Sequence, residues 1–412
     1  MDYTDIITTI TCVLSILFLK KISNPINLFN PFVYFFWSFY IFSFFAILYR
    51  NKYAYALSIS SETIFFINSG LYFYLIGGYI SFITSPNKKI DKINTEYQIQ
   101  ILQSTQTSKL ILFIFLTIPI LFAIYFLSLT NEFLWLSDSF DDYRISLREG
   151  SGWIAIFGTS SAYFAAIYSC IYFSIRKNIL LNTIAIIILS ISAIVYGNRA
   201  PALEILVIGG IFLCYHFFGK IRPYHAIIGF FSIMTILMTL GIIRQGLNFD
   251  LESLLKQILW RPFTNIQNIE WITNYFPSTH DFFYGKSLLV DLSVLLPGYQ
   301  PNFGTYIKEL MGLYFSGGSL TLSFLGQAYI DFGYIFALIL IFSFGFLLHR
   351  IYRKTVLNPK FGIFLIISSI YAKSTVSSGL VSPFLYTFIP TIIFLFIYIV
   401  INLIILQKHK VS

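Results

Sequence analysis

Residues 110–129 read LILFIFLTIPILFAIYFLSL, a run without a charged side chain. A helix of this length rises about 30 Å, which matches the hydrocarbon core of a bilayer. Further runs of this kind lie near 3–19, 28–48, 63–83, 153–175, 179–196, 202–218, 225–243, 320–348, 361–380 and 384–406. The 412-residue chain is 57% hydrophobic and 11% charged, which excludes an ordinary soluble globule. We therefore predict an all-α integral membrane protein with about 11 transmembrane helices.

The charged residues predict an orientation for these helices. If the amino terminus lies outside and the spans alternate, the acids of the inner segments are Asp91 and Glu96 alone, against many lysines and arginines. In the outer segments the acids outnumber the basic residues. Because positive charge favours the cytoplasmic side, we predict an outer amino terminus and a cytoplasmic carboxyl terminus. The topology then explains the net charge of +9, which is no evidence for a nucleic-acid partner. Glu204 and Lys373 lie inside predicted spans and have no assigned role.

One long loop interrupts the apolar pattern, at residues 245–319 between predicted spans 8 and 9. Without a repeat or a low-complexity linker, residues 1–412 are predicted to form a single membrane domain that includes this loop. Loops of this length in a compact protein are usually functional, and the alternation places it outside. Within it, residues 251–260 carry apolar residues at helical spacing, which predicts an amphipathic helix on the outer leaflet.

Two arginines stand at the outer ends of predicted spans. Arg199 lies in the turn Gly197-Asn198-Arg199-Ala200-Pro201, and Arg244 opens the long loop. A guanidinium beside hydrocarbon is costly unless it has a partner, and a lipid-linked diphosphate matches its planar fork. Pro201 suits the start of a helix, so Arg199 is expected at a helix amino terminus, where the dipole favours an anion. The alternative is that both residues are exceptions to the charge rule without a functional role.

Other outer residues are candidates for binding and proton transfer. Arg144 and Arg148 stand in an acidic outer loop and Arg261 in the long loop, so each either contacts phosphate or pairs with a neighbouring acid. His280 is the only outer histidine, and histidine suits general base catalysis near neutral pH. The carboxylate alternatives are Glu309, Asp291, Glu270 and Asp281. No nucleotide-binding or metal-binding motif occurs, so we expect no cofactor and no obligatory metal.

Three short motifs resemble those of the Wzy-type O-antigen polymerases, which join oligosaccharide repeat units in bacterial inner membranes. They are Gly197-Asn198-Arg199, then Tyr284-Gly285-Lys286-Ser287-Leu288 followed by Leu295-Leu296-Pro297, and finally Gly317-Gly318-Ser319 with Leu325-Gly326-Gln327-Ala328-Tyr329 and Phe332-Gly333. The resemblance spans residues 134–346 and includes the long outer loop. It departs from the family at Gln327, where members often carry an acid, and at Gly298, where an arginine often follows the proline. The base is therefore sought at His280 or Glu309.

The resemblance implies a GT-C-like glycosyltransferase of lipopolysaccharide biosynthesis. Its substrate would be an undecaprenyl-diphosphate-linked oligosaccharide held among membrane lipids, and a chain-length regulator protein is an implied partner. Arg199, Arg244, His280 and Glu309 are the expected catalytic residues, and Arg144, Arg148, Arg261, Tyr284, Lys286 and Tyr329 are the expected substrate-binding residues. Two alternatives stay open, an O-antigen ligase and a flippase for the same lipid-linked unit. The sugars, the linkage and the choice between O antigen and capsule are not encoded in these motifs.

Overall fold

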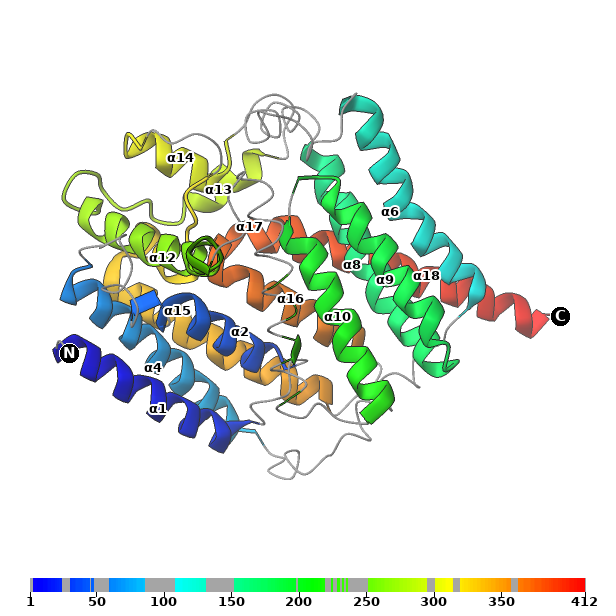
Figure 1. Cartoon of the computed structure of the whole chain (residues 1–412), viewed down its shortest axis with the longest axis horizontal. Helices are drawn as coiled ribbons and strands as arrows, with labels where there is room; N and C mark the ends of the chain where they lie inside the picture. Colours follow the sequence, from blue (N-terminus) through cyan, green and yellow to red (C-terminus); the bar gives the residue numbers. More distant parts are fainter. Residues whose placement is uncertain are drawn as a thin grey trace.

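The computed structural model describes residues 3–23, 30–44, 46–47, 59–85, 108–130, 152–197, 199–218, 224, 228–229, 232, 235, 251–294, 301–313, 319–356 and 362–411. Every regular element in these residues is a helix, which confirms the predicted all-α class for this part of the chain (Figure 1). The elements are α1 (Tyr3–Ile22), α2 (Pro31–Phe39), η1 (Tyr40–Phe44), α4 (Ser61–Ile83), α6 (Lys109–Thr130), α8 (Gly152–Ile175), α9 (Ile179–Ile194), α10 (Arg199–Phe218), α12 (Leu251–Tyr275), α13 (Ser287–Ser293), α14 (Phe303–Leu310), α15 (Phe324–Val356), α16 (Gly362–Ser378), α17 (Val381–Pro383), η5 (Phe384–Phe388) and α18 (Ile389–Val411).

The described helices make this a multi-pass membrane protein. Five are long and apolar enough to cross a bilayer: Ser61–Ile83, Lys109–Leu129, Gly152–Ile175, Phe324–Thr355 and Val381–Ile404. Shorter apolar helices cover Pro31–Phe44, Ile179–Ile194 and Ala200–Cys214. Helices α1 and α16 occupy two more of the predicted runs. Most of the run 225–243 lies outside the described residues, so the total of eleven spans stays a prediction.

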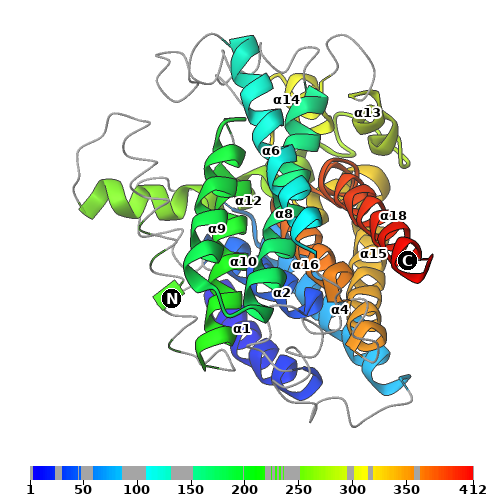
Figure 2. The same ribbon diagram turned by 90° about the vertical axis from the view of Figure 1, so that its right-hand side faces the viewer.

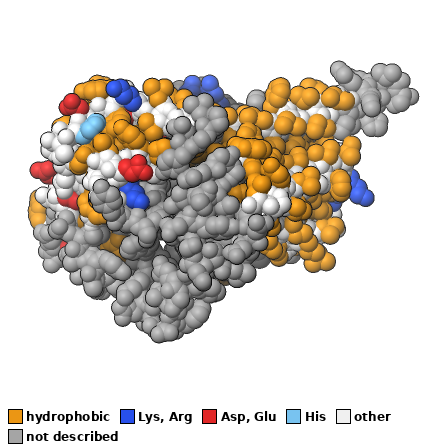
Figure 3. All heavy atoms as spheres, turned by 90° about the horizontal axis from the view of Figure 1, so that it is seen from above, with side chains coloured by type: hydrophobic (Ala, Val, Ile, Leu, Met, Phe, Trp, Pro, Cys, Tyr) orange, Lys and Arg blue, Asp and Glu red, His pale blue; other side chains and the backbone are white. Residues whose placement is uncertain are grey.

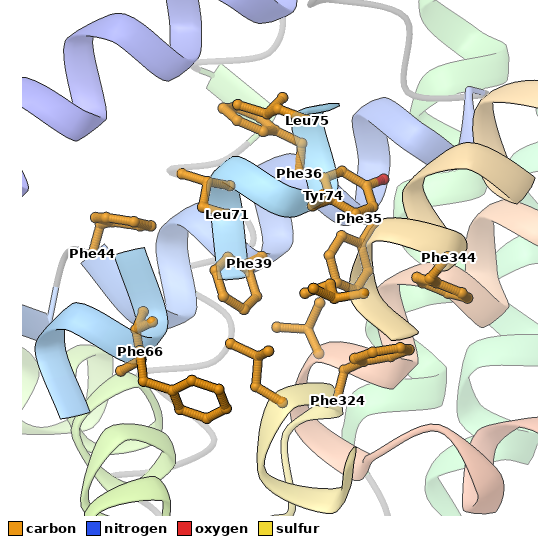
Figure 4. Close-up of a cluster of buried hydrophobic side chains, with 14 of the residues drawn as sticks. Phe35, Phe36, Phe39, Phe44, Phe66, Leu71, Tyr74, Leu75, Phe324 and Phe344 are labelled. Carbon is orange, nitrogen blue, oxygen red and sulfur yellow. The ribbon is translucent and has the colours of Figure 1, made fainter. Parts of the chain in front are cut away.

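Buried apolar side chains form two large clusters in the bundle. The first joins α1, α2, α4 and α15, and the second joins α6, α8, α9, α10, α16 and α18. Figure 4 shows the aromatic centre of the first cluster, where the ring of Phe35 lies 4.5 Å from that of Tyr74 and 5.3 Å from that of Phe344. Helix α16 packs against both α2 and α18, so it links the two clusters.

Helix α15 consists of two segments that meet at Gly333, where φ is 76° and ψ is −176°. Phe324 and Phe344 stand 20 positions apart, so a straight helix would separate them by about 30 Å. Their ring centroids are only 4.8 Å apart (Figure 4). The chain therefore enters the bundle as far as Phe324, returns to Gly333 and turns back. Residues 324–332 form a re-entrant segment, and the segment from 334 to 355, which rises about 33 Å, is long enough to cross the bilayer by itself.

Glycines allow α4 and α15 to pack closely. A Cβ atom at Gly77 would lie 2.0 Å from the carbonyl oxygen of Phe342, and one at Gly345 would lie 2.2 Å from that of Tyr74. Side chains at these positions would force the backbones apart, which explains the small residues. The membrane-crossing segment of α15 therefore lies close against α4.

The two ends of the bundle differ in charge. One end carries the basic last turns of α1 and α15, with Lys20, Lys21, Arg353 and Lys354. Helix α4 ends there too, because Arg350 donates to Ser85 at 3.2 Å. At the opposite end α4 begins beside α12, where Ser60 Oγ donates to Glu270 Oε2 at 2.9 Å. Helices α12, α13 and α14 therefore lie at the end away from these basic turns (Figure 1), which agrees with the predicted alternation of spans.

Candidate functional site

Two of the motifs singled out in the sequence meet at this loop-side end. Asp331, near the end of the re-entrant segment, accepts hydrogen bonds at Oδ1 from the backbone N–H groups of Gly285 (3.2 Å) and Ser287 (3.4 Å). Its Oδ2 accepts from Ser287 Oγ at 2.5 Å. Backbone N–H groups of Phe283 and Tyr284 donate to the carbonyl oxygens of Ile330 (3.0 Å) and Asp331 (2.8 Å). The turn at 284–287 is therefore fixed to the re-entrant segment.

Gln327 connects the same turn to the end of α16. Its Nε2 donates to Ser287 Oγ at 3.1 Å, and its Oε1 accepts from the N–H groups of Leu380 (2.5 Å) and Val381 (3.2 Å). Gly379 has φ +76°, and a Cβ atom there would lie 2.3 Å from Gln327 Oε1, so the close approach requires glycine. Both ends of the amide are used, which gives Gln327 a structural role at the position where the resembled family often carries an acid.

Asp291 is the third polar side chain buried in this region. Its Oδ1 accepts from the N–H of Phe303 at 2.9 Å, and its Oδ2 accepts from Ser382 Oγ at 2.8 Å. Burial raises the pKa of the Asp291 carboxyl, while the two hydrogen bonds oppose the rise. Tyr386 donates to the Asp291 carbonyl oxygen at 2.7 Å. Asp291 thus joins α13 to α14, α17 and η5. We call Ser287, Asp291, Gln327 and Asp331 the loop cluster.

His280 lies beside the loop cluster on the surface of the loop. Its Nδ1 is 2.7 Å from the backbone carbonyl oxygen of Asp281. A carbonyl oxygen only accepts, so Nδ1 carries the proton, and Nε2 of the neutral ring keeps a lone pair. The imidazole stacks on Phe283 with ring centroids 5.2 Å apart. Asp281, one of the predicted carboxylate alternatives, thus contacts the histidine through its backbone.

Four other predicted residues are exposed or half-buried around the same loop. Tyr284 is 71% exposed and has a φ of +51°, a conformation that the contacts of the loop cluster stabilise. Lys286 in the same turn and Glu309 on α14 are exposed. Tyr329 is half-buried, and its hydroxyl donates to the carbonyl oxygen of Phe276 at 3.1 Å. Seen from above in Figure 3, acidic, basic and histidine side chains gather on one half of the molecule, and the other half is largely apolar.

The predicted arginines fall mostly outside the described residues. Helix α10 begins at Arg199, as the turn predicted, with Pro201 at its third position, where no N–H is needed. Arg261 lies within α12, whose bounds include the predicted amphipathic helix 251–260. Arg144, Arg148 and Arg244, and the side chains of Arg199 and Arg261, lie outside what the structure describes.

Glu270, another predicted carboxylate, is fully engaged in holding α4. Its Oε2 accepts from the N–H (3.1 Å) and the Oγ (2.9 Å) of Ser60, the residue that caps α4. Its Oε1 accepts from Asn274 at 3.0 Å. Glu270 therefore anchors the first turn of a membrane helix to the loop helix α12.

An ion pair inside the bundle was missed by the sequence reasoning. Lys373 on α16 forms a salt bridge with Glu204 on α10, and Tyr163 on α8 donates to the other carboxylate oxygen at 2.5 Å. Glu204 lies about 7.5 Å along α10 from Arg199, and Lys373 lies about 7.5 Å along α16 from its end at Ser378. We call the ion pair of Glu204 and Lys373, together with the hydrogen-bonded Tyr163, the membrane pair. A signal was present, since Lys373 is the only lysine or arginine within the predicted spans and Glu204 is one of the few acids there.

Comparison with known proteins assigns the family. A family model described as O-antigen polysaccharide polymerase Wzy matches residues 3–410, nearly the full chain. No curated protein and no solved structure matches the chain. The match extends well beyond the residues 134–346 on which the motifs depended, and it confirms the family that they predicted.

Proposed function

This chain belongs to the O-antigen polysaccharide polymerase Wzy family, and we propose that it polymerises oligosaccharide repeat units carried on undecaprenyl diphosphate, at the periplasmic face of the bacterial inner membrane. Family membership implies polymerisation of O-antigen repeat units by a multi-pass inner-membrane protein. The full-length family match is the observation that carries the proposal. The lipid carrier, the face of the membrane and the transfer chemistry are the steps that we add.

The arrangement of helix ends supports chemistry at the face that carries α12, α13 and α14. The last turns of α1 and α15 place four basic residues at the opposite end, which the charge rule assigns to the cytoplasm. The amino terminus and the loop 245–319 are then periplasmic, and the carboxyl terminus is cytoplasmic. Lipid-linked repeat units presented on the periplasmic side would meet His280, Lys286 and Glu309.

The reaction we propose is a glycosyl transfer of the GT-C type. The bond between the anomeric carbon of the growing glycan and its diphosphate breaks, and a new bond forms to a hydroxyl of the incoming unit. Undecaprenyl diphosphate leaves. Two lipid substrates held side by side obtain much of the rate advantage from positioning. The protein must supply charge stabilisation for the leaving diphosphate and an acceptor for the hydroxyl proton.

We assign the diphosphate to Arg199 and Arg244. Helix α10 begins at Arg199, so its free N–H groups and dipole add positive potential at that point. Arg144, Arg148 and Arg261 are proposed as further contacts to phosphate or glycan. Lys286, Tyr284 and Tyr329 complete the proposed substrate-binding set, with the first two exposed in the turn at 284–287. No cofactor or metal takes part in this scheme.

We assign the proton acceptor to His280 and keep Glu309 as the alternative. The contact of Nδ1 with the Asp281 carbonyl leaves Nε2 of the neutral ring able to accept a proton. Glu309 is an exposed carboxylate on α14. Asp291 and Asp331 are less suited, because both are buried and hydrogen-bonded to their surroundings. A chain-length regulator is the partner proposed for this enzyme.

The glycan made by cells with and without this gene tests the proposal. Loss of a polymerase leaves one repeat unit on lipid A core, whereas loss of an O-antigen ligase leaves none. Loss of a flippase stops lipid-linked units from reaching the periplasmic face. The proposal predicts single repeat units, together with reporter fusions that place the loop 245–319 outside. A cytoplasmic loop, or unchanged polymer in cells without the gene, would contradict it.

A further inference from the structure

Helix α13 is inverted in its distribution of polar and apolar side chains. Ser287 and Asp291, one helical turn apart, are each 1% exposed and face the protein. Leu288, Leu289 and Leu292 are 43%, 65% and 37% exposed. A helix at a water-covered surface places its leucines inward and its polar residues outward. The opposite arrangement suits a helix whose outer face meets lipid.

The inward face of α13 is fully satisfied, so the inversion is a stable feature of the fold. Ser287 bonds to Asp331 and Gln327, and Asp291 bonds to Ser382 and to the backbone of Phe303. These partners come from α15, α14 and the segment after α16, so they fix the rotation of α13 about its own axis. Turning the leucines inward would break all of these bonds. The exposed leucines therefore need a favourable surrounding of their own.

The leucines of α13 adjoin a surface that already faces lipid. A Cβ atom at Gly285, just before α13, would lie 3.5 Å from the ring of Phe332. Phe332 is 38% exposed, and Ile335 and Phe336 on the following membrane-crossing segment of α15 are 70% and 60% exposed. Figure 2 shows α13 above α15 and α18 on the same side of the molecule. The apolar surface of the membrane helices thus continues onto the loop helix.

We propose that Leu288, Leu289 and Leu292 of α13 insert into the acyl chains of the leaflet on the loop side. The occupant of this face is the bilayer itself, because the face continues a membrane-crossing surface. Helix α13 is then an interfacial helix that the loop cluster fastens to the bundle. The sequence predicted this role for residues 251–260, whose side chains lie outside the described residues, and the described side chains of α13 lead us to propose it there.

Insertion of α13 also sets the depth of the turn at 284–287, a step that rests on the proposed function. Tyr284 and Lys286 directly precede the leucine face and are exposed. Tyrosine is enriched at the membrane–water boundary, and a lysine there extends its ammonium group toward the head groups. This is the level at which the diphosphate of a lipid-linked glycan lies. Lys286 would therefore contact the diphosphate of the substrate and not its sugars.

Fluorescence quenching in vesicles tests the insertion directly. The full chain, with the partly exposed Cys214 replaced by serine, carries Leu289→Cys labelled with the environment-sensitive dye NBD. Thr279→Cys, exposed in the polar turn before His280, is the matched control. The vesicles contain phosphatidylethanolamine and phosphatidylglycerol, with or without a phospholipid that carries a nitroxide high on its acyl chain. We expect the nitroxide lipid to remove most of the fluorescence at position 289 and little at 279, and aqueous iodide to do the reverse.

Equal quenching of both positions by iodide, with none by the nitroxide lipid, would overturn the proposal. Protection of position 289 from both quenchers would overturn it too, because a second protein chain would then cover the face. Leu292→Cys serves as a second labelled position if the first variant does not insert into vesicles. No substrate is present, so a negative result here leaves the proposed polymerase activity to its own test.

Discussion

The loop cluster and the membrane pair are both buried and polar, but they are built from different partners. In the loop cluster, Asp331, Gln327 and Asp291 accept mainly from backbone N–H groups and so determine the path of the chain. In the membrane pair, Glu204 accepts from two side chains, Lys373 and Tyr163, and so joins three helices that are already formed. The first cluster shapes a loop, and the second holds a bundle together.

This difference separates the side chains that support the fold from those that could take part in the reaction. Every carboxylate in either cluster has hydrogen-bond partners on both oxygens and is at most 5% exposed, so none is free to meet a glycan. Ionisable groups near the loop cluster that reach the surface include the half-buried His280 and the exposed Asp281, Lys286 and Glu309. The comparison predicts that variants of exposed groups and arginines stop the reaction, and that variants of the two clusters change stability or loop order first.

The largest effect is expected from the arginines, which belong to neither cluster. Arg199→Ala and Arg244→Ala should each abolish polymer while the protein stays in the membrane, because losing a preorganised stabiliser costs on the order of 100-fold or more in rate. Lysine should rescue poorly at a bidentate contact. Glycan gels of cells carrying each variant measure the effect. Arg176→Ala is the control, because Arg176 directly follows α8 on the predicted cytoplasmic side and lies over the ring of Tyr172. Full-length polymer from both variants would show that the two arginines influence only membrane topology and take no part in the reaction.

His280 should give the next largest effect, and its stacking on Phe283 allows a sharp design. His280→Ala removes both the ring and the nitrogen, whereas His280→Phe keeps a ring against Phe283. If Nε2 accepts the proton, both variants lose about 100-fold or more in turnover. His216→Ala and His409→Ala, near the cytoplasmic face, should polymerise normally. Near-normal turnover by His280→Phe would show that only packing matters, and loss in Glu309→Gln alone would move the base to that carboxylate.

Breaking the membrane pair should lower stability more than it alters the reacting groups. Glu204→Gln and Lys373→Met each leave a charge without its partner, which costs about 3–5 kcal/mol in a buried setting. The double variant removes both charges and should recover most of the loss. Thermal unfolding of the purified protein in detergent measures this, with Tyr163→Phe as the variant that loses one hydrogen bond. Single variants as stable as the wild type would show that the pair is not a support.

Ser287→Ala should give the smallest effect and should act on the loop alone. It leaves Asp331 Oδ2 and Gln327 Nε2 without their bonds to Ser287 Oγ, which costs about 1–3 kcal/mol. Ser293→Ala, on the same helix, removes only a bond to the carbonyl of Val290 and is the matched control. Amide hydrogen exchange of residues 284–288 should rise in the first variant and not in the second. Equal amide exchange in the two variants would contradict the claim that the loop cluster shapes this turn.

The sequence predicted the class of fold because apolar runs of bilayer length leave few alternatives. It placed the start of α10 at the Gly197–Pro201 turn, and its motifs identified the family. It did not predict the re-entrant segment, because residues 320–348 read as one long apolar run. Only the positive φ of Gly333, in a Phe-Gly pair already noted as a motif, marks the reversal.

The contacts of the site were harder to predict than its members. Ser287 and Asp331 stand 44 positions apart, and nothing in their own neighbourhoods indicates the other. Asp331 was not among the predicted site residues, although it organises the turn that the motif search had marked. The pairing of Glu204 with Lys373 was not predicted either, although two opposite charges in apolar spans have few other partners. A hydrogen bond between a neutral and an acidic side chain far apart in the sequence, such as Ser287 and Asp331, has no comparable signal in the sequence.

Reconstitution of the purified chain tests the central claim most directly. The protein in lipid nanodiscs is mixed with an undecaprenyl-diphosphate-linked repeat unit, and the products are separated by glycan length. We predict a ladder of lipid-linked products carrying successive repeats, with one undecaprenyl diphosphate released for each linkage, and no ladder from Arg199→Ala. Single repeat units that stay unjoined under the same conditions, or that are transferred only when lipid A core is added, would contradict the account.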